Sequence, residues 1–145
     1  MTAQDHFIAM LRDRVAPALR DLGLKGSGQT FIAQSEDCWL LVGFQKSAYS
    51  DSSLVTFTVN VTAANKAAWA AAQTTRPHLP NRPSPNVFYG SFIWQSRIGN
   101  VMPGGKDHWW RLDPHTDPAA LAEAVIEAIR DFALPAMRAA TGSPA

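Results

Sequence analysis

The sequence predicts an α+β domain in which helices from the two ends of the chain pack on one face of an antiparallel sheet of about five strands. Two observations lead to this prediction. Apolar residues recur every three or four positions near both termini, and they alternate with polar residues over 54–61. The first pattern is typical of amphipathic helices and the second of a strand with one buried face. The length of 145 residues fits a single domain, which we expect to be ordered over roughly 3–138.

The first predicted element is a helix from Thr2 to Asp21. Pro17 is expected to kink this helix or end it early, because proline lacks the backbone N–H that an inner turn needs. Gly23 is a suitable C-terminal cap, and Gly26-Ser27-Gly28 is expected to form a turn.

Three strands are predicted next. The β-prone runs Gln29–Gln34 and Cys38–Gln45 indicate a hairpin, and Leu54–Val61 is the clearest strand of the chain. Val55, Phe57, Val59 and Val61 share its predicted core face, whereas its other face carries polar side chains. These polar residues are Thr56, Thr58 and Asn60.

A short alanine-rich helix is predicted over Asn65–Gln73, with Trp69 as its bulky anchor. Four prolines in Thr74–Asn86 then indicate an extended loop, because neither a helix nor a central strand tolerates that density of proline. Val87–Ile98 and Asp107–Leu112 are rich in aromatic and β-branched residues, and they predict a second hairpin.

The last predicted element is a helix capped by Thr116 or Asp117, with Pro118 in its first turn. Pro135 is expected to shorten the end of this helix. Residues 139–145 contain no apolar anchor, so we expect the C-terminal tail to be frayed.

Composition excludes several classes of protein. Thirteen basic and twelve acidic residues give a net charge of +1, which disfavours a nucleic-acid partner and binding to an anionic membrane. No run of about 18 apolar residues and no signal-like N-terminus occur. Cys38 is the only cysteine, which fits a reducing compartment. We therefore expect a cytoplasmic protein.

Familiar catalytic and metal-binding patterns are weak in this sequence. The glycines around Lys25 follow a predicted helix and precede a strand, which is the reverse of a phosphate loop. Asp107, His108, Asp113 and His115 are of metal-ligand type, but strand alternation and a loop separate the two histidines. The sequence thus predicts no metal site and no cofactor.

The most informative pattern is the polar face of the sheet. Strand alternation allows the neighbouring strands to add Gln45, Gln95, Arg97 and Arg111 to the face that carries Asn60. Amide and guanidinium groups together suit the recognition of a small anionic ligand. A solvated polar face without a ligand is an equally ordinary outcome. Trp109 and Trp110 must point in opposite directions, so one of them is expected to be partly exposed.

Seven short motifs follow one another along almost the whole chain. They are Gly23, Thr30-Phe31, Phe44-Gln45-Lys46-Ser47, Phe57-Thr58-Val59-Asn60, Arg97-Ile98-Gly99, Asp107-His108-Trp109-Trp110 and Ala133-Leu134-Pro135. In order and spacing this series resembles the bacterial domain-of-unknown-function family numbered 4304. The resemblance implies one complete domain and no assigned activity. It also implies that Lys46 and one of the two neighbouring tryptophans belong to the family's polar pattern.

Three hypotheses about function follow. The first is a small binding module for an anionic ligand or a protein partner, which uses a polar and aromatic sheet face. Its candidate ligand-binding residues are Gln45, Lys46, Asn60, Arg97, Trp109 and Arg111. The second is an enzyme that acts on a small anionic substrate, with His108 as its general base. The third is a protein that binds single-stranded nucleic acid through arginines and aromatic rings. The oligomeric state is left open.

Overall fold

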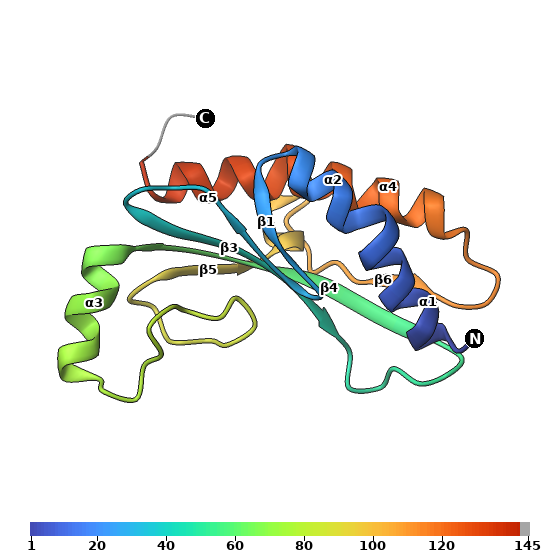
Figure 1. Ribbon diagram of the computed structural model, residues 1–145, viewed down its shortest axis with the longest axis horizontal. Helices are drawn as coiled ribbons and strands as arrows, with labels where there is room; N and C mark the ends of the chain where they lie inside the picture. The colour runs from blue at the N-terminus through green and yellow to red at the C-terminus, as the bar shows by residue number, and fades with distance from the viewer. Residues whose placement is uncertain (143–145) are drawn as a thin grey trace.

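The computed structural model describes residues 1–142 as an α+β domain (Figure 1). Its sheet consists of β1 (Leu24–Ser27), β2 (Thr30–Ala33), β3 (Cys38–Lys46), β4 (Val55–Asn65), β5 (Trp94–Arg97) and β6 (Trp110–Leu112). Its helices are α1 (Ala3–Met10), α2 (Ala16–Asp21), α3 (Lys66–Thr75), α4 (Pro118–Ala128) and α5 (Leu134–Ala140), with a short 3-10 helix at Ile98–Val101. The helical part therefore extends beyond residue 138, and residues 143–145 of the predicted frayed tail lie outside the described residues.

The central strand β4 organises the sheet. The order is β1-β2-β3-β4-β5, and every neighbouring pair is antiparallel. Both β5 and β6 pair with β4, β5 along Asn60–Ala63 and β6 along Val55–Phe57. The predicted hairpin between these two strands is therefore wrong. At eleven residues, β4 is long enough for the two short strands to lie end to end along one of its edges.

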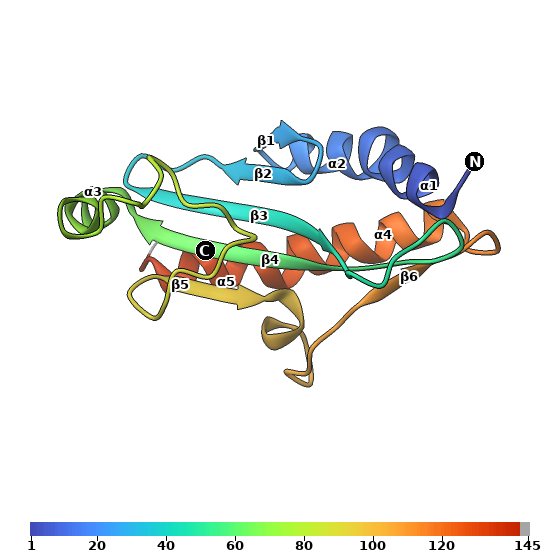
Figure 2. The same cartoon turned by 90° about the horizontal axis from the view of Figure 1, so that it is seen from below.

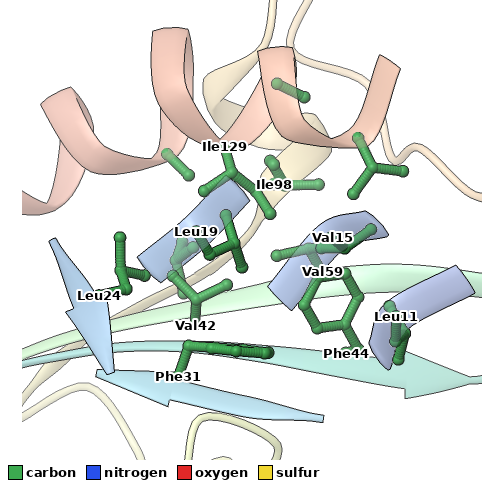
Figure 3. Packing of buried hydrophobic residues seen from close by; sticks show 14 of the residues in the cluster. Leu11, Val15, Leu19, Leu24, Phe31, Val42, Phe44, Val59, Ile98 and Ile129 are labelled. Atoms are coloured by element: carbon green, nitrogen blue, oxygen red, sulfur yellow. The ribbon is translucent and has the colours of Figure 1, made fainter. Parts of the chain in front are cut away.

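Helices cover one face of this sheet, as predicted. α1 and α2 lie beside α4 and α5 above the strands (Figure 1), and the apolar side chains of both layers meet in one core. Figure 3 shows Val15 and Ile129 from the helices facing Val59 and Phe44 from the strands. The core side of β4 is apolar because its odd-numbered residues from Val55 to Ala63 all point toward the helices.

Both prolines expected to interrupt the helices lie within continuous helical segments. A π-helical turn precedes each one, at Leu11–Val15 before Pro17 and at Ile129–Ala133 before Pro135. Proline lacks an N–H, and its ring would meet the carbonyl four residues back in a regular α-helix. The wider π turn accommodates this defect, so the helices continue to Asp21 and Ala140 instead of ending early.

Three local predictions need correction. The segment around Gly26 is the short strand β1 rather than a turn, because it pairs with β2 across the two-residue connection 28–29. The aromatic stretch Val87–Ile93 is loop rather than strand, and the last strand begins at Trp110 rather than Asp107.

The second face of the sheet is only partly open. The segment between α3 and β5, residues 76–93, crosses this face on the side opposite the long helices (Figure 2). We call this segment the proline loop. It divides the polar face into a covered part near β3, β4 and β5 and an exposed part near β6.

Candidate functional site

Three of the predicted polar residues meet on the covered part of the sheet. Asn60 on β4 lies directly opposite Arg97 on β5, and Gln45 on β3 lies opposite Thr58, one pair along on the same face. The Asn60 side-chain amide donates a hydrogen bond of 2.7 Å to Oε1 of Gln45. Strand alternation and register therefore bring together side chains from three strands.

Gly43 is the position in β3 against which the proline loop packs. A Cβ atom at this position would lie 2.5 Å from Oδ1 of Asn86 and 2.6 Å from Cγ of Pro85. Only a residue without a side chain allows the loop to approach so closely. The loop consequently forms a wall beside Asn60, which lies opposite Gly43 in the strand register.

A chain of side-chain amides connects this wall to the sheet. Asn86 Nδ2 donates to the carbonyl oxygen of Phe44 at 3.2 Å, so its Oδ1 faces Asn60 and accepts a hydrogen bond from Asn60 Nδ2 at 3.0 Å. The second hydrogen on Asn60 Nδ2 goes to Gln45 Oε1. Because a backbone carbonyl can only accept, it sets the direction of every amide in the chain.

This direction determines which polar atoms are offered to a ligand. Within residues 1–142, Gln45 Nε2 and Asn60 Oδ1 have no hydrogen-bond partner, and neither is a fully buried atom. Gln45 thus presents a donor and Asn60 an acceptor, side by side. The pair can recognise a ligand group that both accepts and donates hydrogen bonds. It can equally recognise a ligand in which an anionic group lies beside an N–H or O–H.

Gln95 fastens the second half of the proline loop. Its Nε2 donates to the carbonyl oxygen of Val87 at 2.6 Å, and its Oε1 accepts from the backbone N–H of Tyr89 at 2.9 Å. One side chain of β5 therefore holds the residues on both sides of Phe88. The backbone of the loop is bound here much as it would be by a neighbouring strand.

Trp69 of α3 holds the outer part of the loop. Its indole N–H donates to the carbonyl oxygen of Pro80 at 2.9 Å, and its ring contacts those of Tyr89 and Phe92 at centroid distances of 5.0 and 5.9 Å. The tryptophan packed under the proline loop is thus Trp69 rather than Trp109 or Trp110. The predicted role of Trp69 as the anchor of its helix is confirmed by its burial.

Arg97 is held from its other side by two residues of the loop before β6. Its Nη1 donates to Asp107 Oδ2 at 3.0 Å, and its guanidinium lies 5.0 Å from the centre of the Trp109 ring. The indole N–H of Trp109 donates to the same carboxylate oxygen at 2.9 Å. Within the described chain, Arg97 Nε and Nη2 make no hydrogen bond, so these two nitrogens can serve an anionic ligand.

The loop that carries Asp107 lies close against the 3-10 helix after β5. A Cβ atom at Gly99 would collide with the carbonyl oxygen of Lys106 and the N–H of His108. The absence of a side chain at Gly99 therefore lets this loop reach Arg97.

The proline loop and the polar side chains of β3, β4 and β5 line an open pocket of about 370 Å³ on the polar face. We call it the amide pocket. Its lining includes Gln45, Asn60, Asn86, Phe88, Gln95 and Arg97. The volume lies at the lower end of the range for small-molecule sites, about 300 to 1,000 Å³.

Three further predicted residues lie outside the amide pocket. Lys46 lies opposite Phe57, so its position in β3 belongs to the face that carries the helices. Arg111 is exposed on the polar face opposite Thr56, about 13 Å along β4 from the position of Asn60 at roughly 3.3 Å per residue. The ring of His108 contacts that of Trp110 at 4.6 Å, while the backbone carbonyl of His108 accepts a hydrogen bond from Thr58.

The neighbouring tryptophans divide as their alternation predicts. Trp110 is buried in the core, where its ring stacks on Phe57 at 5.6 Å. Trp109 is half-buried beside Arg97. The partly presented tryptophan is therefore Trp109, at the margin of the site.

Asp113 and His115 form a turn before α4. Oδ1 of Asp113 accepts the backbone N–H of His115 at 2.8 Å and the hydroxyl of Thr116 at 3.2 Å. The hydrogen bond from the His115 backbone is the largest cause of a lowered pKa at Asp113. Across residues 1–142, no three His, Cys, Asp or Glu side chains gather as metal ligands would.

Comparison with known proteins connects this geometry to one family. The model of the family described as a domain of unknown function, DUF4304, matches residues 15–139. The chain belongs to the DUF4304 family. Neither the curated proteins nor the solved structures contain a match. In the described part of this DUF4304 domain, no helix has the length and apolar character needed to cross a membrane.

The motifs that carry the family resemblance meet in space. Gln45 and Asn60 come from two separate motifs and share a hydrogen bond. Arg97 and Asp107 come from two more and form an ion pair. In this DUF4304 domain, four motifs that are far apart in sequence therefore contribute side chains to one site.

The main residues that sequence reasoning missed belong to the proline loop. Asn86 and Phe88 line the amide pocket, yet the composition of their segment indicates only a connecting loop. Gln95 was predicted on the polar face, but its role in holding the loop was not. The sequence does contain one indication of this contact. Gly43 lies inside a strong strand, and a glycine in such a position can mark the place where another segment, here the proline-rich loop, packs closely.

Proposed function

We propose that this DUF4304 domain is a small binding module that holds an anionic ligand in the amide pocket. The observation that carries the proposal is the convergence of Gln45, Asn60 and Arg97 from three strands on one pocket, with unpaired polar atoms at its surface. A core does not require such an arrangement, and a merely solvated face does not require a loop packed over it.

The charges and hydrogen-bonding atoms support an anion rather than a neutral ligand. Arg97 supplies the positive charge, and its Nε and Nη2 suit a planar carboxylate or a phosphate. Gln45 Nε2 adds a neutral donor, and Asn60 Oδ1 accepts from any N–H or O–H next to the anion. Asp107 bonds only Nη1 of Arg97, so within residues 1–142 the other two guanidinium nitrogens stay available to a ligand.

A protein partner that inserts an acidic side chain or its C-terminal carboxylate into the same pocket is the second candidate. The observation that favours it is the apolar rim beside Arg97, where Phe88 is 80% exposed and Val87 is 47% exposed. Exposed apolar residues at the edge of a polar site commonly mark contact surfaces.

The other two hypotheses receive less support. A general base at His108 would have to reach a substrate held by Arg97, whereas the ring of His108 faces Trp110. Binding of single-stranded nucleic acid would need a continuous basic groove, and Arg111 lies well apart from Arg97 on a chain of net charge +1.

The proposal includes neither a cofactor nor a metal. It places the protein in the cytoplasm, in keeping with the single buried thiol of Cys38.

Native mass spectrometry tests the proposed function. The wild-type protein, Arg97→Gln and Arg111→Gln are purified gently from the source organism. The two variants remove the same charge from the same face of the sheet, but only Arg97 lines the pocket. We expect the wild type and Arg111→Gln to carry the same additional mass and Arg97→Gln to lose it.

The size of that mass separates a metabolite from a protein partner. Circular dichroism confirms that both variants fold. Bare protein in all three samples, or equal retention of the mass by both variants, would contradict the proposal.

A further inference from the structure

We propose that the ligand of the amide pocket is a planar aromatic anion, whose ring stacks on Phe88 while its carboxylate or phosphate binds Arg97. This inference rests on the proposed function and names the ligand class more closely. The juxtaposition that carries it is an exposed aromatic residue, with its backbone neighbours held by hydrogen bonds, in the lining of a pocket that also contains an arginine.

Phe88 is exposed without being on a loose tip. The residue is 80% exposed, while the residues on both sides are held by Gln95, which bonds the carbonyl oxygen of Val87 and the N–H of Tyr89. A backbone clamped at both neighbours presents the side chain between them at a defined place. Such preorganisation lowers the entropic cost of ordering a contact residue when a ligand binds.

The other aromatic residues of the proline loop are used differently. Tyr89 and Phe92 both contact the ring of Trp69, and the hydroxyl of Tyr89 accepts the backbone N–H of Ser84 at 2.9 Å. Their rings stabilise the loop itself. Among the aromatic side chains of residues 76–93, Phe88 alone is largely exposed and borders the amide pocket.

Size and chemistry point to one ring with one anionic group. The pocket of about 370 Å³ is bounded by Phe88 on the loop side and by Arg97, Gln45 and Asn60 on the sheet side. A compact ligand can touch both boundaries at once. A flat ring offers its face to Phe88, and aromatic pairs are more favourable than contacts of equal apolar area with an aliphatic group.

The test compares benzoate with cyclohexanecarboxylate. The two probes share a charge, a carboxylate and a six-membered ring, and they differ in planarity and π electrons. Binding is followed by NMR through the side-chain amide signals of Gln45 and Asn60, which lie in the pocket. We expect benzoate to bind about three- to tenfold more tightly than cyclohexanecarboxylate. In a second arm, phenyl phosphate is compared with benzoate to distinguish a phosphate ligand from a carboxylate, and with inorganic phosphate to show what the ring contributes.

Variants show where the preference arises. Phe88→Leu keeps an apolar side chain and removes the ring, so we expect equal affinities for the two carboxylates. Tyr49→Leu removes the ring of a residue that is 93% exposed and outside the pocket lining, and this variant is expected to keep the wild-type preference. Arg97→Gln is expected to abolish the shifts caused by both probes.

The possible results separate the two proposals. Equal, Arg97-dependent affinities for benzoate and cyclohexanecarboxylate would overturn the aromatic ligand and leave the proposed function standing. A benzoate preference that persists in Phe88→Leu would likewise overturn the role of Phe88. Amide shifts that are absent with all probes, or that persist in Arg97→Gln, would overturn both.

Discussion

The two faces of the central sheet differ in what holds their covering layer. On the helix-covered face, β4 presents Val59 and Val61 to a continuous apolar core. On the loop-covered face, the intervening residue Asn60 makes directed hydrogen bonds to Gln45 and Asn86. Apolar burial is non-directional and tolerates changes of angle, whereas a chain of amides fixes the position of each partner.

The energies of the two faces differ as well. A large side chain buried in the core contributes several kcal/mol, while a single neutral hydrogen bond contributes about 0.5 to 1.5 kcal/mol net. The stability of the domain therefore resides mainly in the helix-covered face. The loop-covered face can be altered at lower cost, which suits a surface that binds a ligand.

Removing a ring from the helix-covered face is expected to have the largest effect. Phe57 is fully buried and contacts the rings of Phe7, Phe44 and Trp110. We expect Phe57→Ala to lower the free energy of unfolding by about 3 to 5 kcal/mol, because it leaves a cavity among these rings. Urea denaturation followed by circular dichroism measures the change. Phe88→Ala is the control, with an expected effect within about 0.5 kcal/mol; similar losses from both variants would break the distinction between the faces.

A methyl group at Gly43, against which the proline loop packs, is expected to have the second largest effect. Gly43→Ala places its Cβ against Pro85 and Asn86, and we expect a loss of about 1 to 3 kcal/mol together with displacement of the loop. Urea denaturation gives the stability, and the amide signals of Asn60 and Gln45 report the displacement.

The double variant Gly43→Ala, Asn86→Ala removes one of the two clashing groups. It is therefore expected to cost less than the sum of the single changes. Unchanged amide signals in Gly43→Ala would show that the position of the proline loop does not depend on the absence of a side chain at residue 43.

Releasing Arg97 from Asp107 is expected to alter binding more than stability. The two side chains of this pair are 42% and 49% exposed, so solvent screens the pair, and Asp107→Asn should change stability by less than about 1 kcal/mol. The freed guanidinium should bind benzoate roughly two- to fivefold more tightly, measured by NMR titration. Asp51→Asn, in the turn before β4, is the control for a general loss of negative charge. Weaker binding by Asp107→Asn would show that the carboxylate positions Arg97 rather than competes for it.

The smallest expected effect lies outside both faces, at the turn before α4. The pKa of Asp113 is lowered in the folded protein, mainly by the hydrogen bond from the His115 backbone. Its ionised form therefore stabilises the fold above the ordinary aspartate pKa, and this stabilisation is lost as pH falls through the lowered value. We expect Asp113→Asn to be slightly less stable than the wild type at pH 7 and equal to it in strong acid. Urea midpoints between pH 7 and pH 2 measure the difference, and a gap that widens in acid would contradict this assignment.

The polar face could be predicted from sequence to a large extent. Alternation along β4 is a local property, so the opposite orientations of Val59 and Asn60 follow from the strand itself. The same reasoning placed Gln45 and Arg97 on the face of Asn60, and the observed register agrees. The prediction of Lys46 as a ligand-binding residue is not supported by this register, because Lys46 is one step along β3 from Gln45 and therefore lies on the other face.

The pairing of strands depended on contacts between distant residues. β1 is short and contains Gly26 at a positive φ, so its β-propensity is low, and it is a strand only because β2 lies beside it. β5 and β6 looked like the two arms of a hairpin, but each is a better partner for the long edge of β4 than for the other. No local pattern distinguishes these alternatives.

The sequence by itself determined the α+β class, the two long helices and the faces of the central strands, because each follows from the spacing of apolar residues along a single segment. Only the tertiary structure decided that the proline loop lies over the polar face and converts it into a pocket. That outcome depends on the space above Gly43 and on two hydrogen bonds of Asn86, which accepts from Asn60 and donates to the carbonyl oxygen of Phe44, 26 and 42 residues away. Close approach and side-chain hydrogen bonding are properties of three-dimensional neighbours, so they leave no period in the sequence.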